Sequence, residues 1–253
     1  MTLELTPAPV AAPRWRRVLT HARTEASLLL RNGEQLILAL VIPVGVLVAG
    51  VLLGDRVGLD PAVLPASVLA LALWSTTFTS LAINTGFERR YGVLERLVAT
   101  PLTRGDLVLG KALGTAAVAG AQVLLLAVIA VLLGWRPSPT LPQTLYVVVA
   151  AGTAMVCFAA LALVLAGRLR AEATLALANL FYLAVAAAGG VILPVASYPT
   201  WAQPIVAATP TGALGESLRG WSTGTLGFGH LATISIWTII AVVLARKAFR
   251  WTS

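Results

Sequence analysis

Few residues in this chain could catalyse a reaction or bind a metal. The two histidines, His21 and His230, and the single cysteine, Cys157, lie far apart in the sequence, whereas a metal site needs several such ligands close together. The sequence contains neither a His-Glu-x-x-His pair nor a Gly-x-Ser-x-Gly turn. We therefore expect no metal site and no catalytic residue.

One segment approaches the pattern of a nucleotide-binding loop. A P-loop needs Gly-x4-Gly-Lys followed by Ser or Thr, whose hydroxyl binds magnesium. Residues 105–111 fit this pattern, but Ala112 stands where the hydroxyl residue is required, and no strand is expected before the segment. We expect it to open a membrane helix, with the Lys111 ammonium reaching the cytoplasmic headgroups. The chain itself is predicted to bind no cofactor.

The composition indicates what kind of scaffold positions these residues. Of the 253 residues, 58% are hydrophobic and 11% are charged, and the mean hydropathy is +0.88. Soluble domains average about 25% charged residues, because polar groups must cover their surface. The composition excludes an ordinary soluble enzyme and a disordered chain, and a single cysteine excludes a disulfide scaffold. A polytopic membrane protein remains.

Six long apolar runs are the predicted spans. They cover residues 35–53, 62–85, 107–133, 144–166, 173–193 and 226–245. A span needs about 20 apolar residues, and it must be helical because lipid offers the backbone no hydrogen-bond partners. The pattern predicts an all-α polytopic membrane protein with six transmembrane helices. A long charged segment precedes the first run, so we expect no cleaved signal peptide.

The positive charges indicate the orientation. If both termini lie on one side of the membrane, that side holds 15 of the 18 Lys and Arg residues, and the other side holds only Arg56, Arg136 and Arg219. The positive-inside rule therefore places both termini in the cytoplasm. The net charge is +8, but the bases are spread over separate juxtamembrane segments. This spread favours contact with membrane lipid and argues against nucleic acid as a partner.

The N-terminal segment divides into a tail and an amphipathic helix. Residues 1–13 contain three prolines and are expected to form an irregular cytoplasmic tail. Residues 14–33 place apolar side chains at helical spacing with bases between them, which predicts an interfacial elbow helix. Its residues expected at the membrane surface are Trp15, Arg16, Arg17 and Arg23. The helix could serve only as an anchor, or it could also contact a cytoplasmic partner.

The segment between the second and third runs carries dense charge of both signs. Apolar residues within 93–98 form a short stripe surrounded by Glu and Arg, and Pro101 ends this helix because proline disfavours helix at the preceding residue. Thr103 or Asp106 can cap the next span. We expect a short charged helix fixed between two spans, so that a partner moving it would move both. The alternative is a solvated loop of mixed charge.

This segment resembles the stretch after the second span of ABC-2 type exporter permeases. The pattern of that family is roughly Arg-Glu-x-Gly-Thr-Leu-Glu-x-Leu, then Thr or Ser with Pro, then Gly-Lys at the next span. The matching residues here are Arg89, Gly92, Leu94, Glu95, Leu97, Thr100, Pro101, Gly110 and Lys111. The chain departs at Arg90, where an acid is common, and at Val93, where Thr is common. The resemblance extends over the amphipathic start, the six runs and the last outer segment.

The resemblance implies a transport subunit without an ATPase of its own. It would pair with a second permease chain, identical or different, and bind two copies of a cytoplasmic ABC ATPase that holds ATP and Mg²⁺. In the family, the short helix after the second span is the coupling helix. The residues expected to contact the ATPase here are Phe87, Glu88, Arg89, Arg90, Gly92, Leu94, Glu95, Arg96, Leu97, Thr100 and Pro101.

Polar residues within the predicted spans are few. Those that could line a cargo path are Asn84, Gln122, Asn179 and Tyr182, although hydrogen bonding between helices is the commoner use of such groups. Residues 189–220 are too apolar for a free loop and too rich in proline to span. We therefore expect extracellular re-entrant half-helices between the fifth and sixth spans. Residues 34–253 then form one six-helix domain.

These expectations describe the permease subunit of an ATP-driven exporter in a bacterial plasma membrane, moving a drug-like or lipid amphiphile out of the cell. Two alternatives remain. One is a non-transporting assembly or immunity protein that shares the fold. The other is an ion-coupled secondary transporter, although no carboxylate lies in the middle of a predicted span to carry a proton.

Overall fold

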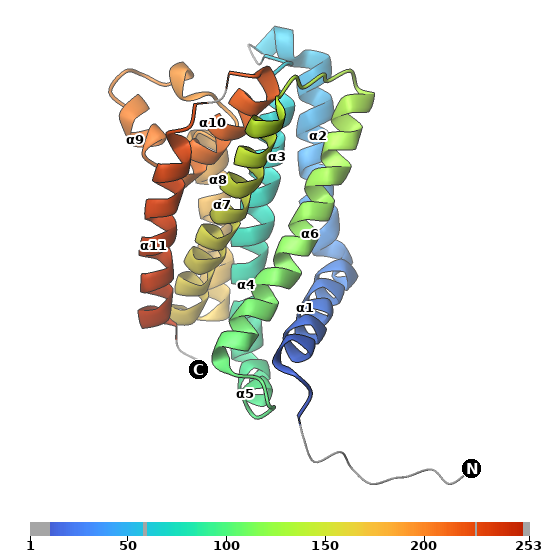
Figure 1. Ribbon diagram of the computed structural model, residues 1–253, viewed down its shortest axis with the longest axis vertical. Helices are drawn as coiled ribbons and strands as arrows, with labels where there is room; N and C mark the ends of the chain where they lie inside the picture. Colours follow the sequence, from blue (N-terminus) through green and yellow to red (C-terminus); the bar gives the residue numbers. More distant parts are fainter. Residues whose placement is uncertain (1–10, 58–59, 226, 250–253) are drawn as a thin grey trace, which may run out of the picture.

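The computed structural model describes residues 11–57, 60–225 and 227–249, with the side chains of all but 34–39 and 52–57. Regular structure in these residues is entirely helical, as predicted, and most helices run along one long axis (Figure 1). The helices are α1 (Arg14–Arg31), α2 (Gly33–Val57), α3 (Leu64–Trp74), α4 (Leu81–Arg90), α5 (Val93–Val98), α6 (Arg104–Leu132), α7 (Leu141–Arg168), α8 (Ala171–Ala188), α9 (Gln203–Ala207), α10 (Pro210–Thr223) and α11 (His230–Ala248).

Five of the six predicted spans have a helix of sufficient length and hydropathy to cross a membrane. They are the continuous segment Leu64–Arg90, which includes α3 and α4, and the helices α6, α7, α8 and α11. The first predicted span falls on α2, whose apolar part among the described residues is the shorter stretch Leu40–Val51. A sixth span at residues 35–53 therefore stays a prediction.

Of the predicted tail, residues 1–10 lie outside the described part, and residues 11–13 precede α1 without helical structure.

Two predicted spans differ from the observed helices in detail. The second is interrupted by a π-helical turn, η1 (Ser75–Ser80), which an apolar pattern does not reveal. The Thr77 hydroxyl donates a hydrogen bond to the Leu73 carbonyl within this turn, a bond that competes with the regular helical ladder. The fifth ends at Ala188 instead of residue 193, because the chain turns at Gly190, whose φ is +70°.

The core surrounds α3. Every residue of this helix from Leu64 to Trp74 is buried, and it packs against α2, α6, α7 and α10. A helix that is apolar on all sides is expected at such a central place. The Trp74 ring stacks on Phe78 with 4.2 Å between centroids, and its edge meets Phe158 at 4.9 Å. These contacts join the π-helical turn to α7.

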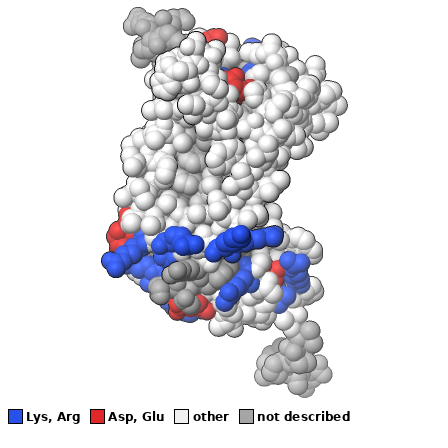
Figure 2. All heavy atoms as spheres, turned by 90° about the vertical axis from the view of Figure 1, so that its left-hand side faces the viewer, with Lys and Arg blue, Asp and Glu red and all other residues white. Residues whose placement is uncertain are grey.

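The two ends of the bundle differ in charge. The described chain begins and ends beside α5, whereas α9 and α10 lie at the opposite end (Figure 1). Lys and Arg side chains gather in a belt toward the α5 end on the face that Figure 2 shows. The structure thus places both ends of the described chain at one end of the bundle, in agreement with the segregation of bases in the sequence.

Candidate coupling site

The helix α5 lies between the ends of α4 and α6. The chain enters it through Gly92, whose φ of +66° is readily adopted only by glycine. The side chain of Leu94 is 1% exposed and anchors α5 to the bundle, while Glu95 and Arg96 are exposed. The Arg96 guanidinium donates a 2.9 Å hydrogen bond to the Tyr91 carbonyl and so braces the turn. A short helix with a charged outer face therefore joins two long ones.

The segment after α5 is held by the start of α1. Of the two predicted capping residues, Thr103 is the N-cap of α6, and Asp106 completes a capping box with it. The Asp106 carboxylate also accepts a 2.7 Å hydrogen bond from the Arg14 guanidinium. The Arg17 guanidinium donates to the Pro101 carbonyl. Two arginines of α1 thus fix the connection between α5 and α6.

A buried ion cluster lies where α1, α4 and α6 meet. The Lys111 side chain is almost fully buried, and its Nζ lies 2.9 Å from each oxygen of the buried Glu25 carboxylate. The same ammonium forms an ion pair with Glu88, close to the end of α4. The expectation that Lys111 reaches the headgroups was wrong, because α1 covers this face of α6 and two carboxylates replace water around the ammonium.

His21 extends this cluster along α1. Its Nε2 lies 3.5 Å from Glu25 Oε1, and the imidazole is buried. Burial lowers the pKa of His21 from its usual 6.5, and the nearby Lys111 charge acts in the same direction, against the attraction of the Glu25 carboxylate. The imidazole is therefore neutral at pH 7. The cluster thus brings two carboxyl groups to one ammonium.

Two glycines of α6 let α1 approach closely enough to form the cluster. A Cβ at Gly114 would lie 2.6 Å from the Ala22 carbonyl oxygen, and a Cβ at Gly110 would lie 2.4 Å from the His21 ring. Small residues spaced in this way let membrane helices pack closely. The small face of α6 is thus used for packing within one chain at this point.

Replacing Gly114 with Val is expected to destabilise the chain by about 1–3 kcal/mol, because the clash is with backbone and overpacking of that kind costs this much. Gly120→Val is the matched control, since nothing lies within 4 Å of a Cβ at Gly120 of the same helix. Thermal unfolding of both purified variants in detergent measures the difference. Equal unfolding temperatures would contradict the close α1–α6 contact.

On the side of α4 opposite the ion cluster, two arginines contact the junction of α7 and α8. The Arg89 guanidinium donates to the Leu169 carbonyl, and Arg90 forms an ion pair with the Glu172 carboxylate. Both members of the Arg90–Glu172 pair are exposed, so it contributes at most about 1 kcal/mol. The pair matters for position rather than for stability, since it links the end of α4, next to α5, to the start of α8.

Comparison with known proteins identifies this architecture. The sequence model of the ABC-2 type transporter family matches residues 13–221, from the start of α1 to α10. The chain belongs to the ABC-2 type transporter family. Membrane subunits of this family are generally not enzymes themselves.

Relatives include the probable doxorubicin resistance ABC transporter permease protein DrrC of two Mycobacterium tuberculosis strains, CDC 1551 / Oshkosh and ATCC 25618 / H37Rv. Each is 28% identical to this chain over 194 residues, which cover 72% of this chain and 66% of the relative. The match thus spans slightly less than two thirds of the length of these relatives.

The residues that the ABC-2 resemblance assigns to the ATPase contact are not equally accessible. Arg90, Glu95, Arg96, Thr100 and Pro101 are exposed. Phe87, Glu88, Arg89, Gly92 and Leu97 are partly buried, and Leu94 is buried. The exposed residues form a surface that a partner could touch, whereas Leu94 is buried and Glu88 pairs with Lys111. The contact of these residues with an ATPase stays a prediction.

The segment of the predicted elbow helix is helical, as α1, but its apolar side chains are not all on one exposed or one buried face. Val18, Ala22 and Leu29 are buried, and α1 packs chiefly against α6. Of the four residues expected at the membrane surface, Trp15, Arg16 and Arg23 are exposed and Arg17 is partly buried. The position of α1 in the membrane interface stays a prediction.

The four candidate cargo residues lie in different surroundings. Gln122 is buried on α6, and its amide oxygen accepts a hydrogen bond from the Thr76 hydroxyl in η1. Asn84 and Tyr182 are partly buried, on α4 and α8, and Asn179 is exposed on α8. The hydrogen bond of Gln122 therefore joins α6 to η1. The cargo path stays a prediction.

Two acidic residues of the site were missed from the sequence. Glu25 follows Val18 by seven residues and Ala22 by three, a spacing that places it on the buried face of α1. This spacing was a usable signal, because an acid on a buried face needs a basic partner. Glu172 carried no comparable signal, since exposed acids near helix starts are common.

The segment that resembles a P-loop is helical. Residues 105–111 lie within α6, and the described chain before it holds only helices and turns. Lys111 is engaged by the Glu25 and Glu88 carboxylates.

Proposed function

We propose that this chain is the transmembrane permease subunit of an ATP-driven ABC exporter in a bacterial plasma membrane, with both termini in the cytoplasm. The observation that carries the proposal is α5, a short helix with exposed charge that lies between α4 and α6 at the end where the bases gather. Membership in the ABC-2 family supports the same reading.

The energy would come from a separate subunit. Two copies of a cytoplasmic ABC ATPase would bind ATP and Mg²⁺ and dock on the exposed face of α5, against a dimer of this chain or a pair with a different permease. Displacing α5 would move α4 and α6 directly. It would also act on α1 through Glu25, Lys111 and Glu88, and on α8 through the arginines at the end of α4.

The cargo class that we infer is an amphiphile, either drug-like or lipid. The relatives named for doxorubicin resistance favour the drug-like class. Asn84, Gln122, Asn179 and Tyr182 remain the candidate contacts along the path. The segment with η2 (Val195–Ser197), α9 and α10 would cap the outer end as re-entrant half-helices.

The decisive experiment is reconstitution. The chain is purified from native membranes with whatever ATPase accompanies it and placed in proteoliposomes, and export of doxorubicin as a fluorescent probe is followed with ATP, without ATP, and with a proton gradient alone. Export that requires ATP supports the proposal. Export on the gradient alone would indicate the ion-coupled alternative, and a complex without an ATPase would indicate an assembly or immunity protein.

Glu95→Ala is expected to weaken binding of the ATPase roughly tenfold, because loss of a charged contact at an interface costs about 1.5–3 kcal/mol. Glu95 is exposed on α5, so the substitution should leave unfolding unchanged. Titration of the ATPase against the chain in nanodiscs measures the dissociation constant. Asp60→Ala, exposed near the opposite end, is the control, and equal affinity in both variants would remove α5 from the interface.

A further inference from the structure

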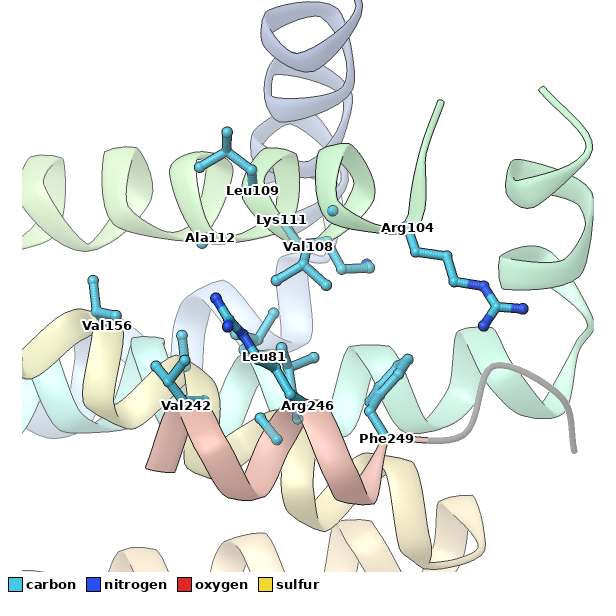
Figure 3. A pocket seen from close by; sticks show the side chains of 15 residues that line it. Leu81, Arg104, Val108, Leu109, Lys111, Ala112, Val156, Val242, Arg246 and Phe249 are labelled. Carbon is cyan, nitrogen blue, oxygen red and sulfur yellow. The ribbon is translucent and has the colours of Figure 1, made fainter. Parts of the chain in front are cut away.

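A cavity of about 500 Å³ lies at the α5 end of the bundle, beside the coupling site, with which it shares Lys111. One wall is the first part of α6, the other is formed by α7 and α11, and Leu81 of α4 lies at its back (Figure 3). Cavities of this size accommodate small molecules. It exists because several lining positions carry small residues, namely Gly105, Ala112, Ala159, Ala160 and Ala245.

The lining is apolar apart from its basic residues. Most of the wall consists of alanine, valine and leucine, with Phe249 near one end, and none of the described residues that line the cavity is acidic. Lys111 belongs to the lining, but its ammonium is already paired with Glu25 and Glu88. The cavity therefore combines an apolar interior with a positive charge from arginine.

Arg246 brings a positive charge to the cavity from α11, and Arg104 at the start of α6 also belongs to the lining. The Arg246 guanidinium extends from α11 toward α6 (Figure 3), and it makes no hydrogen bond or ion pair with the described residues. A guanidinium offers a planar fork of donors that matches the oxygens of a phosphate. The residue lies three positions before the end of the described chain, which ends at the same end of the bundle as α5 (Figure 1). Lys and Arg gather toward this end on the face shown in Figure 2.

We propose that this cavity binds one anionic phospholipid from the membrane leaflet at the α5 end, with the phosphate on Arg246 and part of an acyl chain along the apolar wall. We infer a negatively charged ligand because Arg246 has no acidic neighbour among the described residues of the lining. We infer an amphiphilic ligand because the rest of the lining is apolar and because the cavity lies at the end of the bundle toward which Lys and Arg gather. The inference does not depend on what the chain transports.

The test counts bound lipids by native mass spectrometry of the full chain, released from detergent micelles that contain one added lipid. Phosphatidylglycerol is expected to bind as a single retained molecule, at least about tenfold more tightly than phosphatidylcholine with the same acyl chains, because only the former carries a net negative charge. Inorganic phosphate distinguishes a lipid from a free anion, and it is expected neither to bind nor to displace phosphatidylglycerol.

Two matched pairs of variants locate the site. Arg246→Gln is expected to lower affinity for phosphatidylglycerol about tenfold, whereas Lys247→Gln, the same charge change one residue away and outside the lining, should change it less than about twofold. Ala112→Phe fills the cavity and should abolish retention, while Ala117→Phe, exposed on the same helix and outside the lining, should not.

Several results would overturn the proposal. Equal losses in Arg246→Gln and Lys247→Gln would mean that lipid binds the charged belt without a defined site. Retention that survives in a folded Ala112→Phe chain, or competition by inorganic phosphate, would contradict occupation by a lipid. A change of oligomeric state in Ala112→Phe with lipid retention intact would assign the cavity to a second copy of the chain. The arginine variant keeps the test decisive if Ala112→Phe fails to fold.

Discussion

Lys111→Met is expected to lower the free energy of unfolding by about 3–5 kcal/mol, the cost of removing one partner from a buried ion pair. Methionine preserves most of the length of the side chain, so the loss is mainly one of charge. Glu25 would remain buried and Glu88 partly buried, and both carboxylates would lose the ammonium that now pairs with them. Since the total stability of a domain is about 5–15 kcal/mol, this is among the largest single effects available in the chain.

Titration with a denaturing detergent in mixed micelles measures this loss. The control is Lys247→Met, because Lys247 is exposed near the end of α11. The triple variant Lys111→Met, Glu25→Gln, Glu88→Gln tests the cause, since it removes the uncompensated carboxylates together with the lysine. It is expected to regain most of the lost stability. A triple variant as unstable as the single one would show that packing, and not charge, explains the effect.

The fold of this chain was largely predictable because lipid imposes strict demands on sequence. Long apolar runs must be helices, and five of the six predicted spans have suitable helices. The start of α6 was equally predictable, since Thr103 and Asp106 form a capping box from local sequence alone. The short helix α5 was found from its apolar stripe and from the proline that follows it.

The contacts of the candidate site were less predictable because they join residues far apart in the sequence. Lys111 was assigned to the headgroups, since nothing local shows that α1 folds back over it and supplies Glu25. The pairing of Arg90 with Glu172 likewise depends on how α4 and α8 pack. Hydropathy also averages over the π-helical turn in the second span, because Ser and Thr there alter the hydrogen bonding without interrupting the apolar pattern.

A second buried charge holds the end of the bundle opposite α5. Arg219 of α10 is 4% exposed, and its guanidinium donates to the Ser67 hydroxyl at 3.0 Å and to the Gly190 and Val191 carbonyls at 2.8 Å. It also pairs with the Glu216 carboxylate at 2.8 Å. One side chain thus connects α10 to α3 and to the turn after α8.

Arg219→Leu is expected to destabilise the chain by about 3–5 kcal/mol, because Glu216 and two buried carbonyls would lose their donor. Arg136→Leu, exposed at the same end, is the control. The substitution should lower the stability of the whole chain and should also loosen one segment in particular. The Glu216 carboxylate also accepts a 2.7 Å hydrogen bond from the Val195 amide, so losing the arginine should loosen the turn after α8.

Hydrogen exchange separates these two effects of Arg219→Leu. In the variant, backbone amides of residues 190–198 should exchange faster at denaturant concentrations where α6 and α7 remain protected. Adding Glu216→Gln should recover only part of the lost stability, because the two carbonyls stay without a donor. Full recovery would mean that the ion pair alone carries the effect, and uniform exchange across the chain would mean that Arg219 does not hold this segment in particular.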